Sequence, residues 1–177
     1  MQLKMEIELI QSKIRDIPDF PRPGITFKDI TPLLQDHRAF QISIERMAEH
    51  LERFSIDVIV GIESRGFIFG PAIAYRLKKG FVPLRKKGKL PWKTEQVSYA
   101  LEYGEATLEV HQDAILPGQR VAIIDDVLAT GGTAVAAREL IEKLGGSVVA
   151  FSFLGELGFL NGRDKLSGYE AFSLLQF

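Results

Sequence analysis

The chain has 177 residues, of which 46% are hydrophobic and 25% charged, and a formal net charge of −1; these values suit one globular domain without the basic field that general nucleic-acid binding needs. Cysteine is absent, which excludes disulfides, thiol nucleophiles and thiolate metal sites. No apolar run approaches the roughly 20 residues that span a bilayer, and the first residues lack a secretory apolar core, so we expect a cytoplasmic protein without membrane contact.

The N-terminal segment predicts a helix and then a turn-rich stretch. Apolar residues recur at helical spacing through residues 1–15, which predicts an amphipathic helix. Residues 18–24 hold three prolines and a glycine, which end that helix and force an extended conformation. Asp36 is predicted to cap a second helix, whose apolar stripe runs from Phe40 to Leu51.

From residue 57 onward, short apolar runs alternate with helical segments. This alternation predicts βαβ units and a mainly parallel sheet, in which ligands bind at the carboxyl ends of the strands. The predicted strands are residues 57–62, 81–85, 121–124 and 147–154, and the predicted helices are 66–79, closed by Gly80, and 134–144, closed by Gly145 and Gly146. Residues 86–107 show little periodicity and predict a long loop or loose hairpin, which in a compact domain is usually functional.

Residues 121–133 are the most informative stretch. Four apolar residues, three of them β-branched, lead into the adjacent carboxylates Asp125 and Asp126. Such a pair is costly to bury unpaired, so a sugar diol or a cation is expected to satisfy it. The turn 129–133 then brings two glycines and two hydroxyls to a helix N-terminus, which suits an oxyanion. The alternative is a plain strand–turn–helix junction with an aspartate cap, which leaves the second aspartate unexplained.

Other nucleotide and hydrolase motifs do not fit this chain. A dinucleotide site would need Gly-x-Gly-x-x-Gly, and an ATP-binding loop would need Gly-x-x-x-x-Gly-Lys-Ser/Thr. Neither occurs, and because the 129–133 loop has no lysine it fits a terminal monophosphate better than a polyphosphate. A hydrolase nucleophile at Ser64 would need glycine at position 62, where the chain has Ile62.

The stretch 121–133 resembles the 5-phosphoribosyl-1-pyrophosphate (PRPP) signature of type I phosphoribosyltransferases. In that family the two acids contact the ribose hydroxyls, directly or through a metal, and the loop holds the 5-phosphate. The resemblance implies a ribose role for Asp125 and Asp126. It implies a 5-phosphate role for Ala129, Thr130, Gly131, Gly132 and Thr133.

The same resemblance implies two segments beside the pyrophosphate. The first segment is the turn 62–66. On its residues alone it could be a simple βα turn capped by Ser64, but in the family this turn contains a cis peptide bond and faces the pyrophosphate. Residues 85–89 hold four cations, which ordinarily form a solvated face, but the family uses this segment for the pyrophosphate, sometimes across a dimer interface. The implied pyrophosphate residues are Ser64, Arg65, Arg85, Lys86 and Lys89.

Residues 19–32 and 98–104 resemble the family members that take adenine as acceptor, and the likeness then covers nearly the whole chain. Adenine needs an aromatic or apolar face and backbone groups for its edge, and Phe27 offers such a face. The alternative is Phe27 as a core aromatic. One departure is Glu63, where many relatives carry aspartate, and the charge is kept. The implied adenine residues are Ile25, Phe27, Lys28 and, on the other face, Leu128.

Residues 101–103 resemble the family's mobile catalytic loop. Its closure would exclude water from a ribosyl cation. The resemblance implies that Glu102 assists proton removal from the purine and that Tyr103 belongs to the loop; the alternative is a solvated hairpin. The histidines show no metal-ligand spacing.

Together these observations predict an α/β fold: a central, mainly parallel sheet flanked by helices, in a single domain 1–177 with an N-terminal hood segment at about 1–35 and a mobile loop at about 86–107. The resemblance implies a homodimer that converts adenine and PRPP to AMP and pyrophosphate in purine salvage, with Mg²⁺ arriving on PRPP near Asp125 and Asp126. The alternatives are transfer to another purine, such as hypoxanthine or xanthine, and a non-catalytic PRPP sensor that binds nucleic acid.

Overall fold

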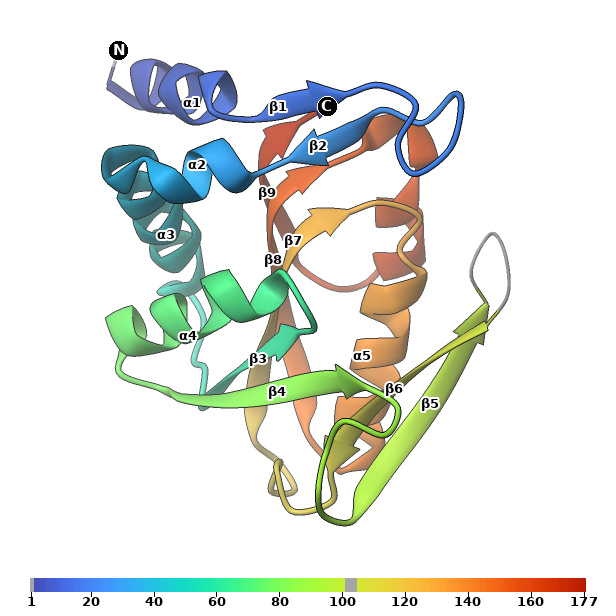
Figure 1. Ribbon diagram of the computed structural model, residues 1–177. Helices are drawn as coiled ribbons and strands as arrows, with labels where there is room; N and C mark the ends of the chain where they lie inside the picture. The colour runs from blue at the N-terminus through green and yellow to red at the C-terminus, as the bar shows by residue number, and fades with distance from the viewer. Residues whose placement is uncertain (1, 101–104) are drawn as a thin grey trace. The chain divides into compact units, whose positions relative to one another are not determined.

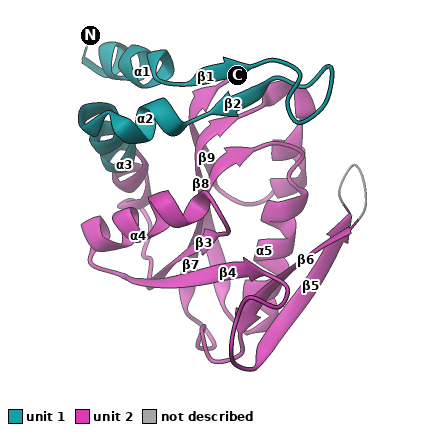
Figure 2. Ribbon diagram, viewed as in Figure 1, with its two compact units in different colours: residues 1–46 teal, residues 47–177 magenta. Residues whose placement is uncertain are grey.

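A computed structural model describes residues 2–100 and 105–177. The chain forms two compact units, Met1–Arg46 and Met47–Phe177 (Figure 2). The first unit contains α1, Gln2–Ser12; β1, Arg15–Ile17; β2, Phe27–Asp29; α2, Thr31–Gln35; and the first part of α3, His37–Leu51. That the chain acts as one domain stays a prediction.

The first unit is organised by a two-stranded sheet that the sequence did not predict. Strands β1 and β2 pair antiparallel, and Arg15 holds Asp29 across the pair with Nη2 2.7 Å from Oδ2. Helix α1 ends at Ser12, short of the predicted residue 15. The cap prediction is confirmed, because Asp36 Oδ1 accepts the backbone N–H of Ala39 at 3.0 Å. The short helix α2 before it, which begins on Thr31-Pro32, was not predicted.

The second unit is built on a seven-stranded sheet in the order β5-β6-β4-β3-β7-β8-β9 (Figure 1). The strands from β4 to β9 in this order are parallel, and β6 and β5 extend the sheet antiparallel. The mainly parallel sheet is therefore confirmed. The elements are β3, Val58–Ile62; α4, Gly66–Leu77; β4, Gly80–Lys86; β5, Thr94–Ala100; β6, Glu105–His111; β7, Arg120–Leu128; α5, Gly132–Lys143; β8, Ser147–Glu156; the 3-10 turns η1, Gly158–Leu160, and η2, Gly162–Leu166; and β9, Ala171–Gln176.

Helices α4 and α5 cover opposite faces of the sheet. Because successive side chains of a strand point to opposite faces, alternate residues of β3 face α5 and α4. Val58, Val60 and Ile62 of β3 join the apolar core that α5 fills with Ala137, Leu140 and Ile141. The intervening Gly61 lies against Gly70 of α4. All of β3 is buried, as expected for a central parallel strand covered on both sides.

Three parts of the second unit differ from expectation. Helix α4 ends with Lys78 in the left-handed conformation, with φ of 56°; Gly80 instead begins β4, which corrects the predicted cap. Of the two predictions for the segment 86–107, a long loop or a loose hairpin, the hairpin is confirmed, but its pairing is regular, with register from Thr94↔His111 to Ala100↔Glu105. Strand β9 at the end of the chain was not predicted. No helix among residues 2–100 and 105–177 is long and apolar enough to cross a membrane.

Candidate functional site

Three predicted site segments meet at the carboxyl edge of the sheet. Strand registers place Ile62 beside Leu84 and Gly61 beside Ile124. The turn after β3, the basic segment after β4 and the acid pair at the end of β7 therefore leave the sheet from the same edge. The sequence predicted this meeting from the rule that parallel strands present their carboxyl ends together.

The loop between β7 and α5 surrounds a small open hollow of about 70 Å³. Gly131 turns the chain with φ of 79°, and α5 begins at the next residue. The first N–H groups of a helix have no partner within it and attract anions. Thr133 Oγ1 also donates to Tyr99 Oη of the hairpin at 3.3 Å. The lining residues are Asp125, Val127, Leu128, Ala129, Thr130, Gly131, Thr133, Ala134 and Phe153.

Asp125 and Asp126 lie within β7, which continues to Leu128 instead of ending before the acids as predicted. The two carboxylates have different surroundings. Asp125 lines the hollow, and its Oδ1 accepts the backbone N–H of Asp126 at 2.9 Å. Asp126 is 3% exposed, and its Oδ2 lies 2.6 Å from Nε of Arg65 in an ion pair. Burial, and then the charge of Asp126, raise the pKa of Asp125 well above its usual range. Burial also raises the pKa of Asp126, against the opposing effect of Arg65.

The turn after β3 has the cis peptide bond implied by the resemblance, between Glu63 and Ser64. Ser64 is exposed and Arg65 half-buried. The next residue, Gly66, packs directly on β7, since a Cβ there would lie 2.7 Å from the carbonyl oxygen of Ile124. Glycine at this position therefore lets the first turn of α4 reach the acid pair.

Glu63 connects this turn to the basic segment. Its Oε2 accepts the backbone N–H of Lys86 at 2.9 Å and lies 3.3 Å from Nε of Arg85. Burial favours the neutral carboxyl, but the N–H of Lys86 and the charge of Arg85 outweigh it, so the pKa of Glu63 is lowered. Arg85 Nη1 also donates to the carbonyl of Lys89 at 3.0 Å. From the sequence, Glu63 stood out only as a replacement for the aspartate of many relatives, and these contacts with the basic segment were not predicted.

Glu109 of β6 was also missed. It is 2% exposed, and its Oε1 accepts the backbone N–H groups of Lys89 and Leu90 at 2.9 and 2.8 Å. Burial favours its neutral form, yet these N–H bonds and Arg85 lower its pKa overall. A buried carboxylate thus fixes the backbone of the basic segment. A charged residue at an inward position of a strand was the available signal.

The predicted adenine residues fall in both units. Phe27 and Lys28 form β2 in the first unit, and Ile25 precedes it with 38% of its surface exposed. Phe27 meets Phe20 edge to face, with ring centroids 5.2 Å apart, and Lys28 Nζ lies 2.8 Å from Asp16 Oδ1. Leu128 is 1% exposed and lines the hollow in the second unit. Glu102 and Tyr103 lie outside the described residues.

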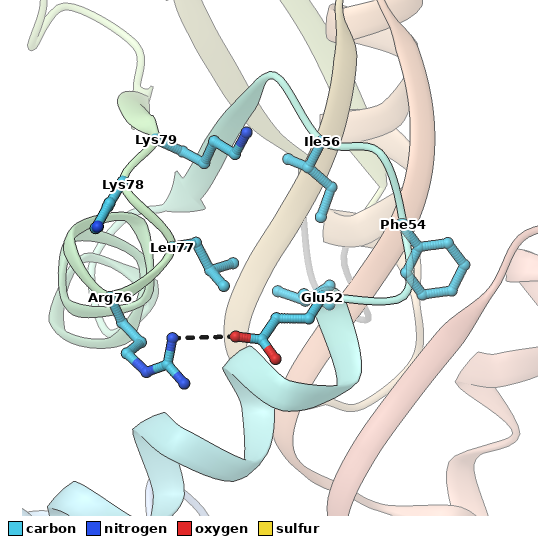
Figure 3. A pocket seen from close by; sticks show the side chains of 8 residues that line it. Glu52, Phe54, Ile56, Arg76, Leu77, Lys78 and Lys79 are labelled. Atoms are coloured by element: carbon cyan, nitrogen blue, oxygen red, sulfur yellow. Dashed lines mark hydrogen bonds and ion pairs between the residues drawn. The ribbon is translucent and has the colours of Figure 1, made fainter.

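A larger hollow of about 350 Å³ lies away from these segments (Figure 3). Its lining comes from residues 51–56, before β3, and 76–79, before β4, so it lies at the opposite edge of the sheet. Arg76 spans it with Nη1 3.0 Å from Oε1 of Glu52. None of the predicted site residues lines it. Among the described residues, no group of three or more His, Asp or Glu could hold a metal ion.

The comparisons with known proteins agree over nearly the full chain. Residues 31–155 match the model of the phosphoribosyl transferase domain. The adenine phosphoribosyltransferase of Symbiobacterium thermophilum is 56% identical over 94% of this chain and 98% of its own length; that of Halothermothrix orenii is 58% identical over 92% and 96%.

Two solved structures are similar in fold as well as in sequence. The adenine phosphoribosyltransferase of Thermoanaerobacter pseudethanolicus matches with a TM-score of 0.94 and 56% identity over 97% of this chain and 99% of its own. The Saccharomyces cerevisiae enzyme, complexed with an imino-altritol bisphosphate and adenine, matches with a TM-score of 0.93 and 42% identity over 97% and 99%.

Proposed function

The chain belongs to the phosphoribosyl transferase family, and we propose that it transfers the 5-phosphoribosyl group of PRPP to adenine, giving AMP and pyrophosphate in purine salvage. N9 of adenine forms a bond to the anomeric carbon with inversion, the bond from that carbon to pyrophosphate breaks, and the N9 proton leaves. The observation that carries this function is likeness over nearly the full length to adenine phosphoribosyltransferases more than half identical to this chain.

The acid pair is proposed to bind the ribose. Asp125 lines the hollow beside the loop, so its carboxylate is available to a hydroxyl of a sugar bound there. Asp126 forms an ion pair with Arg65 in the ligand-free protein. When PRPP binds, Asp126 is proposed to contact the ribose and Arg65 the pyrophosphate. Holding the ribose fixes the anomeric carbon while its bonds change, which is a positioning contribution to catalysis.

The loop Ala129–Thr133 is proposed to bind the 5-phosphate. Its support is the turn at Gly131, the start of α5 directly behind it and the hydroxyl groups of Thr130 and Thr133. Backbone N–H groups and a helix N-terminus together suit a terminal phosphate.

The pyrophosphate is proposed to lie among Ser64, Arg65, Arg85, Lys86 and Lys89. A leaving pyrophosphate gains charge as its bond to the sugar breaks, and fixed cations stabilise that charge. Support comes from Glu63 and Glu109, which hold the backbone of residues 86–90 in place before any ligand arrives.

The adenine contacts remain proposals. Phe27 and Leu128 offer faces to the ring, and Ile25 and Lys28 offer backbone groups to its edge. Glu102 is proposed to assist removal of the N9 proton, within a loop that also contains Tyr103. Closure of such a loop would exclude water from the oxocarbenium-like transition state.

Mg²⁺ is the proposed cofactor. This ion is usually held by one or two carboxylates, water and substrate phosphates, and the hard oxygens of Asp125 and Asp126 are suitable donors. When bound with PRPP it would neutralise phosphate charge, while the chain's own residues position the sugar.

A homodimer is also proposed. Ile68 and Tyr75 lie seven positions apart on α4, hence on similar sides of the helix, and are 36% and 89% exposed. Apolar side chains on one helix face support contact with a second copy. Sedimentation of the wild type and of Tyr75→Glu tests this proposal, since a dimer through α4 would dissociate in the variant. A cytoplasmic location stays a prediction.

The direct test incubates pure protein with isotope-labelled adenine, PRPP and Mg²⁺ and follows labelled AMP. Omission of Mg²⁺ and substitution of hypoxanthine for adenine are the controls, and both should reduce product. Absence of AMP would refute the proposed function, and preference for hypoxanthine in a competition assay would reassign the acceptor.

A further inference from the structure

Two glycines far apart in the sequence meet backbone to backbone beneath the 129–133 loop. A Cβ on Gly162 would lie 2.0 Å from the carbonyl oxygen of Ala129 and 2.8 Å from the backbone nitrogen of Gly131. Conversely, a Cβ on Gly131 would lie 2.5 Å from the carbonyl oxygen of Gly162. Real Cβ atoms do not approach backbone this closely, so the contact exists only because both residues are glycine.

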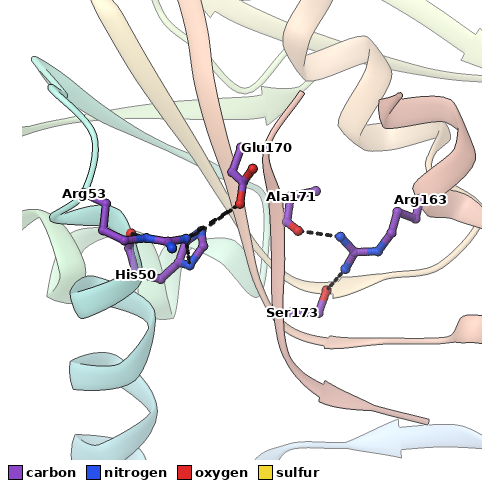
Figure 4. A network of polar contacts seen from close by, with 6 residues as sticks. All are labelled: His50, Arg53, Arg163, Glu170, Ala171 and Ser173. Atoms are coloured by element: carbon purple, nitrogen blue, oxygen red, sulfur yellow. Dashed lines mark hydrogen bonds and ion pairs between the residues drawn. The ribbon is translucent and has the colours of Figure 1, made fainter. Parts of the chain in front are cut away.

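The next residue along the chain, Arg163, is held by contacts with β8 and β9, of which Figure 4 shows those to Ala171 and Ser173. The guanidinium of Arg163 donates from Nε to both oxygens of Glu156 at 3.1 Å. It also bonds the carbonyl of Ala171 and, at 3.2 Å, Oγ of Ser173. Glu156 is 5% exposed, and the bond from Arg163 lowers its pKa although burial opposes this. Strands β8 and β9 therefore fix the residue that follows Gly162.

The loop needs such support because its own residues are small. Ala129, Gly131 and Gly132 carry no side chain that could brace their backbone, and an anion site made of N–H groups works only when those groups are held in place. The 3-10 turn η2 begins at Gly162 and presents bare backbone to the underside of the loop. Larger residues on either side would separate the two segments.

We propose that Gly162 is a positioning residue for 5-phosphate binding, with Arg163 and Glu156 holding it in place. Gly162 does not touch the phosphate; it sets the position of the loop backbone that does. This inference rests on the proposed function of that loop. It assigns to η2, a segment absent from the site predicted by sequence, a selective effect on the phosphate end of PRPP.

The test compares Gly162→Ala with the matched control Gly158→Ala. A Cβ at Gly158 would meet nothing closer than the carbonyl oxygen of Phe177 at 3.8 Å, so the control removes a nearby glycine without a clash. We expect Gly162→Ala to raise the KM for PRPP and the Kd for ribose 5-phosphate at least about tenfold, or about 1.4 kcal/mol, with the adenine KM within about twofold. Gly158→Ala should match the wild type in all three constants.

Arg163→Gln provides a second variant in case Gly162→Ala does not fold. It should raise the same two constants by about threefold to tenfold, while Arg163→Lys, which keeps the charge, should restore part of the binding. Unchanged ribose 5-phosphate affinity in a folded Gly162→Ala protein, or equal increases in the PRPP and adenine constants, would overturn the inference. Binding of ribose 5-phosphate requires no turnover, so a wild type that binds it but makes no AMP would refute the proposed function alone.

Discussion

Nε of Arg65, in the turn that opens α4, lies 2.6 Å from Oδ2 of Asp126, near the end of β7. The sequence assigned these residues to different parts of PRPP, the pyrophosphate and the ribose. Their ion pair joins the two proposed half-sites in the ligand-free protein. It also explains how a carboxylate that is 3% exposed is tolerated next to a second one.

Asp126→Asn should reduce turnover by more than tenfold, equivalent to about 1.4 kcal/mol in the barrier, while changing the melting temperature little. The amide keeps the shape of the side chain but loses the charge that pairs with Arg65 and is proposed to hold the ribose. Steady-state kinetics and thermal unfolding check this, and Asp57→Asn at the opposite edge of the sheet is the control for turnover. Activity within about tenfold of the wild type would mean that Asp126 does not hold the ribose.

Asp125→Asn should stabilise the ligand-free protein while reducing activity. The folded-state pKa of Asp125 is raised, so its contribution to stability is present when it is protonated and is lost as the pH rises through that pKa. At neutral pH the amide removes a buried charge beside Asp126 and can still accept the N–H of Asp126. We expect a gain of about 1 kcal/mol, or about 2–4 °C in melting temperature, that shrinks towards pH 4. A loss of stability at pH 7 would contradict this account.

Glu109→Ala should weaken pyrophosphate binding without a comparable effect on adenine. The change leaves the N–H groups of Lys89 and Leu90 without their buried acceptor, at a cost of about 1–3 kcal/mol in unfolding free energy. Product inhibition by pyrophosphate and the PRPP KM measure the local effect. Glu105→Ala, at an exposed position of the same strand, is the control, and equal inhibition constants in both variants would refute the role of Glu109.

Acid should remove the stabilisation that Asp57 and Arg120 provide where β3 and β7 begin. Hydrogen bonds from Arg120 lower the pKa of Asp57 to about 2 from its ordinary 3.8. A carboxyl with a depressed pKa contributes stability above its unfolded pKa and loses it as the pH falls through the folded value. The difference in melting temperature between wild type and Asp57→Asn should therefore be full at pH 6 and vanish between about pH 4 and pH 2. A difference that persists at pH 2 would show that the pair does not act through this charge.

The sequence predicted what is encoded by neighbouring residues. The stretch 121–133 specifies a strand, two acids, a turn and a helix within one short segment, and all of these are present in the structure. The meeting of the β3, β4 and β7 ends followed from the general geometry of parallel sheets.

What the sequence did not predict depends on residues far apart in the chain. Glu109 acts on residues 89 and 90, and Gly162 acts on residues 129–131; neither has a local pattern that names its partner. The β5–β6 hairpin was left open between a long loop and a loose hairpin because polar residues dominate it, although Val97 and Tyr99 pack on the core at alternate positions.

The pairing of arginines with carboxylates also has a consequence for the rate of association. Arg65 and Arg85 each share their charge with an internal acid, so they project little field into solvent. Lys86, Lys87 and Lys89 add three further positive charges to the same segment, and they would supply the long-range attraction for a polyanion. Raising the ionic strength should therefore lower the association rate constant of PRPP, because salt screens the lysines. The dissociation rate constant should depend instead on Arg65 and Arg85, which would exchange their carboxylate partners for phosphate oxygens when PRPP binds.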